Sequence, residues 1–198
     1  MLKRTKGYIL LALLVVTGLA SQVTNTTLSS KERRFLVQHL KDTKTDFLRS
    51  VKGLSKEQLH FKPAASALSI KECMEQLAQI EDSLWAVASV ALQQPPDQHK
   101  APTPTDAAVL HLENKKGVAL KAQPARWPSA KAALEHFKNQ RQKTITYVRT
   151  TTEDVRSHVT QLPLGSLDAY QVFLLMSAHT ADYTQQIEII KAHPAFPK

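Results

Sequence analysis

Apolar residues recur every three or four positions over four long stretches of the chain, a spacing typical of amphipathic helices in a bundle. The first stretch begins after Ser29 and ends near Gly53, and the second begins after Ser69 and ends at Pro95. In both, a glutamate three residues after the serine completes a capping box, which satisfies free backbone N–H groups. The residues expected to face inward are Leu36, Leu40, Phe47, Leu48, Val51, Ile70, Cys73, Leu77, Ile80, Leu84, Val87 and Ala91.

The other two stretches lie in the second half of the chain. One begins near Ser129 and runs to about Thr152, where a tail of three threonines should fray. The other spans about Asp168 to Lys191, and Pro194 closes it. Their expected inward residues are Leu134, Phe137, Ile145 and Val148, then Val172, Leu175, Met176, His179, Tyr183, Gln186, Ile187 and Ile190.

The connections between these stretches predict the topology. Residues 54–63 form a connector with one helical turn starting at Ser55, and residues 93–128 contain six of the ten prolines. The latter segment is therefore interpreted as a long crossover, with a short helix over residues 105–112 capped by Thr105. No segment shows a competing strand pattern. We expect an all-α, up-down four-helix bundle with a long crossover between helices two and three.

The first 20 residues have the three-part layout of a secretory signal peptide. Three bases lie within the first six residues, residues 8–16 are apolar, and small residues precede a cleavage point before Ser21. The apolar run is shorter than the roughly 20 residues of a membrane-spanning helix. We expect a signal peptide at 1–20, a polar tether at 21–28, the bundle domain at 29–198, and a periplasmic or secreted protein without a stable membrane span. An uncleaved leader that anchors the chain is the alternative.

Export changes how the positive charge is interpreted. The net charge of +9 falls to +6 without the leader, which carries three bases and no acids. The remaining bases are scattered and are not interleaved with aromatic residues, so the composition predicts a solvated surface and no nucleic-acid partner. The only cysteine, Cys73, permits no internal disulfide. On an inward face it behaves as a small apolar residue, and a role as a nucleophile is the alternative.

From Leu36 to the end, the chain resembles the DinB-like (YfiT-like) four-helix bundle family. Three groups of segments carry the likeness: Leu54-Ser55, Phe61-Lys62-Pro63 and Leu68 to Cys73; Leu167 to Gln171 and Ser177 to Thr180; and Gln186-Ile187-Glu188 with Lys191 to Pro197. The resemblance implies a divalent metal held by one histidine on helix two and two histidines four residues apart on helix four. The corresponding positions here are Gln76, His179 and Tyr183, so one ligand of three is kept.

This replacement weakens the implied metal site. An amide oxygen is a poor ligand for zinc, nickel or iron(II), and a phenol must lose a proton of pKa about 10 to bind. His179 would need supplementary carboxylates, for which Glu72, Glu75 and Asp182 are the candidates. The favoured interpretation is a metal-free pocket in which the amide, the imidazole and the phenol hydrogen-bond to one another.

Two classes of function follow, with different cofactors. The favoured one is an exported, non-catalytic DinB-like module without a cofactor that binds a small molecule or a protein. The alternative, implied by the family, is a metal-dependent transferase, isomerase or hydrolase using zinc, nickel or iron. Because bundles of this family often pair, a homodimer is a third expectation, with the dimer itself as the functional form.

Overall fold

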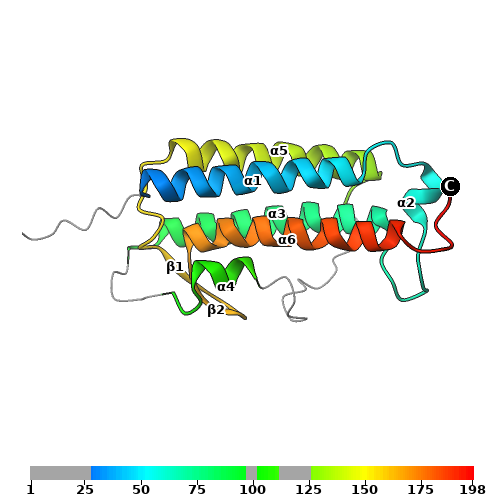
Figure 1. Cartoon of the computed structure of the whole chain (residues 1–198). Helices are drawn as coiled ribbons and strands as arrows, with labels where there is room; N and C mark the ends of the chain where they lie inside the picture. The colour runs from blue at the N-terminus through cyan, green and yellow to red at the C-terminus, as the bar shows by residue number, and fades with distance from the viewer. Residues whose placement is uncertain (1–27, 97–101, 112–125) are drawn as a thin grey trace, which may run out of the picture.

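The computed structural model describes residues 28–96, 102–111 and 126–198, in which helices dominate (Figure 1). The elements in chain order are α1 (Ser30–Ser50), α2 (Lys56–His60), α3 (Ile70–Gln93), α4 (Asp106–Leu110), α5 (Ala130–Thr150), β1 (Val159–Leu162), β2 (Gly165–Asp168) and α6 (Ala169–Lys191). The four long helices pack side by side, which confirms the expected four-helix bundle.

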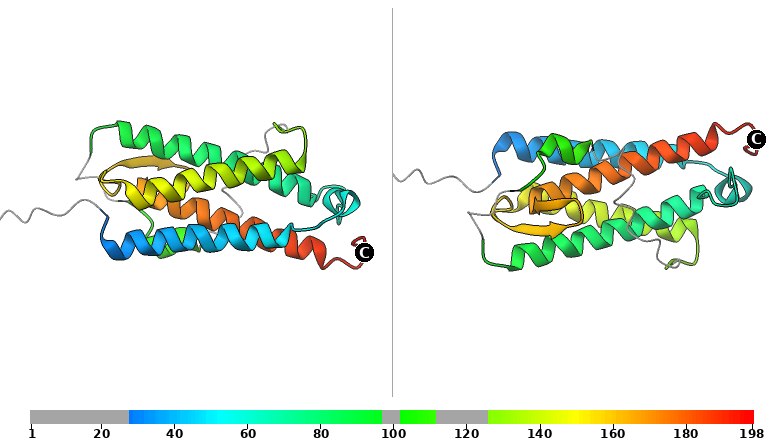
Figure 2. Two further views of the ribbon diagram at one scale, coloured as in Figure 1. Left: turned by 90° about the horizontal axis from the view of Figure 1, so that it is seen from above. Right: turned by 90° about the horizontal axis from the view of Figure 1, so that it is seen from below.

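The crossover sets the direction of the last two long helices (Figures 1 and 2). α5 begins at the end of the bundle where α3 also begins, so α5 runs parallel to α3 and α6 runs parallel to α1. Two hydrogen bonds between helix ends agree with this arrangement. Arg33 Nη1, at the start of α1, donates to Val148 O at the end of α5 (2.6 Å). Lys191 Nζ donates to Ser50 O where α6 and α1 both end (3.2 Å).

Local signals in the sequence predicted the helix ends well. Ser29 and Ser69 form the expected capping boxes, and α2 begins after Ser55. Thr105 caps α4, which is shorter than expected and ends at Leu110. The chain leaves α5 at Thr151, whose backbone is extended, as expected for the weak threonine tail.

The expectation that no strands form was wrong. β1 and β2 make an antiparallel hairpin in which Val159 faces Asp168 and Leu162 faces Gly165. Each strand has only four residues, too few for the alternating pattern to stand out. Tertiary contacts support the hairpin: Thr103 N donates to Ser166 O (2.9 Å) and thereby continues the pairing beyond β2. The hairpin lies across the ends of α3 and α6 (Figure 2).

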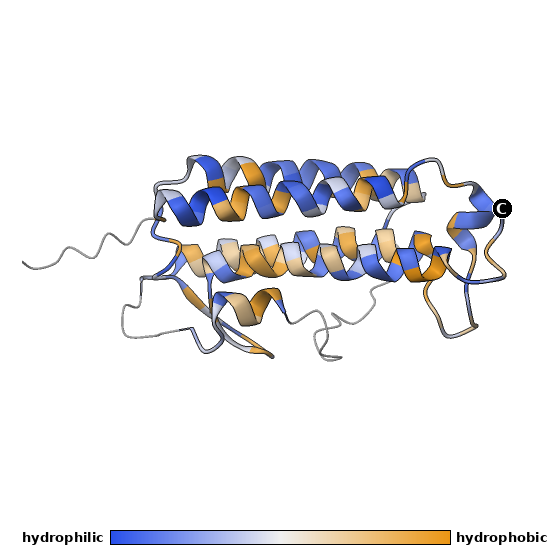
Figure 3. Ribbon diagram, viewed as in Figure 1, coloured by the Kyte–Doolittle hydropathy of each residue, from blue (hydrophilic) through white to orange (hydrophobic). Residues whose placement is uncertain are grey.

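The apolar core has two clusters, one in each half of the bundle. In the half near α4 it includes Leu36, Leu84, Ile145 and Phe173, and in the other half it is centred on Phe47, Leu77, Phe137 and Ile187. Figure 3 shows hydrophilic residues over much of α1 and α5, and long hydrophobic stretches on α6. Most expected inward positions are buried. The half-buried ones are Leu48, Val87, Leu134, His179, Tyr183 and Gln186.

The expected leader and nearly all of the tether lie outside the described residues. The last residue of the expected tether, Leu28, is described; it is 6% exposed and packs in the apolar cluster near α4. Within the described ranges, no helix has the length and apolar character needed to cross a membrane.

Candidate functional site

Two of the three metal-triad positions are bonded to each other between α3 and α6. The Tyr183 hydroxyl donates a hydrogen bond to Gln76 Oε1 at 2.7 Å. Burial raises the pKa of Tyr183 to about 12, with smaller contributions from the nearby Cys73 and Asp182. The phenol therefore keeps its proton at neutral pH and donates it in the hydrogen bond to the Gln76 amide oxygen.

The third position, His179, lies one helical turn before Tyr183 and is not part of this bond. Its Nε2 is buried and has no hydrogen-bond partner among the described residues. Burial lowers the pKa of the imidazole to about 4, so the ring is neutral at physiological pH. Of the three side chains expected to hydrogen-bond to one another, the Gln76 amide and the Tyr183 phenol do so. His179 Nε2 has no partner among the described residues.

The three carboxylates considered as additional metal ligands beside His179 interact with other groups. Glu72 accepts from the Ser69 backbone N–H (2.8 Å) and from Lys62 (2.7 Å), so capping occupies it. Glu75 is almost fully buried and ion-paired with Lys71 at 3.0 Å. The charge of Asp182 acts on the phenol of Tyr183.

These placements test the implied metal against the residues present. In the described parts of the chain, no three histidine, cysteine or acidic side chains lie together in a group that could hold an ion. The nitrogen and oxygen donors at the family positions are one neutral imidazole, one amide and one protonated phenol. This donor set does not fit a three-histidine metal centre.

Cys73 is also unsuited to nucleophilic chemistry at neutral pH. Its side chain is fully buried, and burial raises the pKa of the thiol to about 12, with a smaller contribution from the charge of Glu72. Because only the thiolate is a good nucleophile, the interpretation as a small apolar core residue is favoured.

Sequence reasoning missed a buried ionic layer that separates the two apolar clusters. Arg141 on α5 and Glu81 on α3 are fully buried and form an ion pair. The guanidinium also donates to Leu40 O and Thr43 Oγ1 on α1, each at 3.2 Å, and to Thr180 Oγ1 on α6 at 2.6 Å. Every long helix thus contributes to one hydrogen-bonded layer. A signal was present, because Arg141 fills the inward position midway between Phe137 and Ile145.

Both tryptophans have aromatic neighbours from the bundle itself. Trp85 packs edge-to-face against Tyr147, with ring centroids 5.6 Å apart. Trp127 lies 5.0 Å from the ring of His136, whose Nε2 is 2.8 Å from Asp82 Oδ1. These contacts account for both tryptophans as packing residues, Trp85 on α3 and Trp127 just before the start of α5.

The fold and the site define a class: a four-helix bundle with parallel α1 and α6 and a polar site between α3 and α6. The model of the DinB superfamily matches residues 39–187, and the chain belongs to this superfamily.

A solved structure matches the fold of this chain, whereas the comparison with curated proteins gives no match. YfiT from Bacillus subtilis, described as a probable metal-dependent hydrolase with an unusual four-helix bundle topology, aligns with a TM-score of 0.62 and 11% sequence identity. The alignment covers 86% of this chain and 92% of YfiT, and at this identity it shows a shared fold. No curated protein matches the sequence.

Proposed function

We propose that this DinB superfamily member is a non-catalytic binding module whose site between α3 and α6 takes up a small hydrogen-bonding ligand. One observation carries the proposal: His179 Nε2 is buried and has no hydrogen-bond partner in the described part of the chain. A buried polar atom without a hydrogen bond costs about 1–3 kcal/mol, so a fold retains one mainly where something else binds it.

The protonation states favour an uncharged ligand group. The imidazole is neutral and can donate or accept at Nε2, depending on its tautomer. The neighbouring phenol and amide are also neutral at physiological pH. An ion would lose its hydration here without meeting an opposite charge on these three side chains, whereas a hydroxyl or amide group would gain a partner.

The alternative proposal is a metal-dependent enzyme, for which the description of YfiT is the support. Elemental analysis of protein purified without a histidine tag separates the two. Non-catalytic binding predicts far less than one equivalent of zinc, nickel or iron. If the wild-type chain binds one equivalent of metal that is lost in His179→Ala and kept in His60→Ala, the binding-module proposal is contradicted. The metal-dependent enzyme would then be the favoured function. His60 is a suitable control because it is exposed and lies outside the site.

Ligand binding is tested on the same preparation by native mass spectrometry. We expect a non-covalent adduct of low mass on the wild-type chain, weakened by His179→Leu and retained by His60→Leu. If the adduct is absent from all three chains, or if both variants lose it equally, binding at His179 is wrong.

We further propose that the module acts outside the cytoplasm, on the strength of the leader pattern in residues 1–20. Cell fractionation with intact-mass measurement tests this step. Cleavage after Ala20 predicts a periplasmic or secreted chain that begins at Ser21. A full-length chain in the soluble cytoplasmic fraction would contradict export without affecting the binding proposal.

A further inference from the structure

The crossover segment 102–111, here called the strap, lies against α6 and is also hydrogen-bonded to β2 through Thr103 and Ser166. Its helix, α4, has five residues and packs on α6 (Figure 1). A helix of this length is not stable alone in water, because nucleation is unfavourable and few hydrogen bonds follow it. The strap therefore keeps its shape through its contacts with the rest of the protein.

The apolar part of these contacts is small. Val109 is fully buried and belongs to the same apolar cluster as Leu167 and Leu174, and Leu110 packs against this cluster while half-buried. The other residues of α4 are half-buried or exposed. One valine side chain is a weak anchor compared with the long apolar faces that hold the four main helices together.

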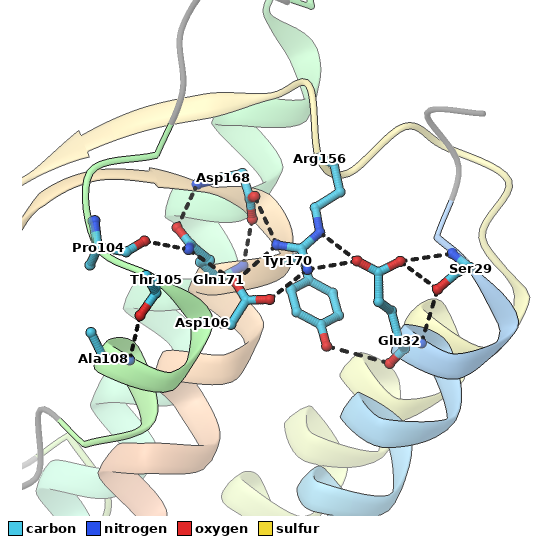
Figure 4. A network of polar contacts seen from close by, with 10 residues as sticks. All are labelled: Ser29, Glu32, Pro104, Thr105, Asp106, Ala108, Arg156, Asp168, Tyr170 and Gln171. Atoms are coloured by element: carbon cyan, nitrogen blue, oxygen red, sulfur yellow. Dashed lines mark hydrogen bonds and ion pairs between the residues drawn. The ribbon is translucent and has the colours of Figure 1, made fainter. Parts of the chain in front are cut away.

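Polar contacts supply the rest of the attachment, and Arg156 dominates them (Figure 4). Its Nη1 and Nη2 donate to the two carboxylate oxygens of Asp106, at 3.0 and 2.7 Å. Gln171 Nε2 donates to Pro104 O (2.8 Å) and to Asp106 Oδ1 (3.0 Å). The two-pronged arginine–carboxylate contact is the strongest geometry in this set.

Arg156 is held in position independently of the strap. It donates to Glu32 on α1 (2.8 Å) and to Asp168 at the start of α6 (3.0 Å), and its guanidinium lies 3.8 Å from the centre of the Tyr170 ring. The Glu32 oxygen that Arg156 binds is not the one that caps α1. Removing the Asp106 carboxylate would therefore leave the contacts of Arg156 with Glu32 and Asp168 in place, together with the cap of α1.

From this asymmetry we propose that Arg156 is a latch, and that the strap opens from α6 as a unit while the four long helices stay folded. Arg156 lies in the turn between α5 and β1, and the strap supplies one carboxylate, that of Asp106, to it. Local opening of this kind is expected where few apolar contacts and a few polar ones hold a segment.

Two thiols in one chain can test this proposal. Cys73 is fully buried between the main helices and reports opening of the bundle, whereas Val109→Cys places a second thiol under the strap. Alkylation by N-ethylmaleimide is followed by peptide mass spectrometry, with each rate divided by the rate for the same chain in denaturant. We expect faster labelling at position 109 than at Cys73.

Three further variants in the Val109→Cys chain locate the latch. Arg156→Gln and Asp106→Asn should each accelerate labelling at position 109 about tenfold, as expected when a charge-assisted hydrogen-bond pair is lost. Cys73 labelling should stay unchanged in Asp106→Asn. Arg126→Gln is the matched control, because Arg126 bonds an acid on α3 and not the strap, and it should change neither rate.

Two labelling results would contradict the proposal. Equal labelling of both thiols in the Val109→Cys chain would mean that the strap opens only when the bundle unfolds, and would overturn the proposal. So would unchanged labelling at position 109 in Asp106→Asn. If Arg156→Gln destabilises the whole chain and exposes both thiols, Asp106→Asn decides, because it leaves the contacts of Arg156 with Glu32 and Asp168 intact.

Discussion

The ionic layer around Arg141 and the polar site at His179 lie in the same bundle and are built in opposite ways. The guanidinium of Arg141 has partners on all three of the other long helices. The imidazole of His179 presents a buried nitrogen that no described residue bonds. A saturated layer specifies how helices fit together, whereas an unsaturated site keeps bonding capacity for something outside the chain.

The largest expected effect comes from breaking the saturated layer. Arg141→Met leaves the carboxylate of Glu81 buried without its counter-ion, and we expect the free energy of unfolding to fall by about 4 kcal/mol. Urea denaturation measures this change. The double variant with Glu81→Leu should recover part of the loss, because no uncompensated charge remains. If Arg141→Met costs less than about 1 kcal/mol, the layer does not hold the helices together.

Introducing the three histidines that the family resemblance implies tests whether the backbone at the candidate site can hold a metal. Gln76→His combined with Tyr183→His would place three imidazoles at the family positions. With free zinc at 100 times its dissociation constant, we expect stabilisation of about 2.7 kcal/mol. Thermal unfolding with and without zinc measures it, and the same variant with His179→Ala is the control. If zinc has no effect on the unfolding temperature, the backbones of α3 and α6 do not bring the three imidazoles within reach of one ion.

The imidazole of His179 predicts that the stability of the fold depends on pH. Its pKa is about 4 in the fold and about 6.5 in the unfolded chain, so the unfolded chain binds the proton first as the pH falls. Its stabilising effect is complete above pH 6.5 and is lost toward pH 4. Between pH 7 and 4.5 we expect a loss of about 2 kcal/mol.

The matched variant for this prediction is His179→Gln, which does not titrate. Carboxylates with lowered pKa values, such as Asp106, also lose stabilisation on acidification, but they do so equally in both chains. The difference between the two denaturation curves therefore isolates the imidazole. Parallel losses in both chains would show that His179 is protonated as easily in the fold as in water.

The two regions also differ in how far the sequence reveals them. Helix positions follow from local signals, since Ser29 with Glu32 and Ser69 with Glu72 form the capping boxes at which α1 and α3 begin. Arg141 interrupts an apolar stripe, and a charge at such a position requires a buried partner. The partner Glu81 is 60 residues away, and only the packing of α3 against α5 identifies it.

The candidate site was harder to predict because it depends on rotamers and on small features of the fold. The family resemblance pointed to Gln76, His179 and Tyr183, but residue types alone suggested that all three pair. Whether the imidazole reaches the other two is decided by side-chain geometry across α3 and α6. The hairpin was missed for a related reason, since four-residue strands owe their pairing to contacts such as that between Thr103 and Ser166.

The smallest expected effect concerns the hydrogen bond between Tyr183 and Gln76 in the candidate site. Tyr183→Phe removes the hydroxyl that donates to Gln76, and the unfolding free energy should fall by about 1 kcal/mol, as for other neutral hydrogen bonds. Gln76→Leu should have a similar effect. In a double-mutant cycle measured by urea denaturation, the two changes should be non-additive by about 1 kcal/mol, because both remove the same bond. Additive losses would mean that the amide and the phenol contribute to stability independently of each other. The hydrogen bond between them would then not stabilise the fold.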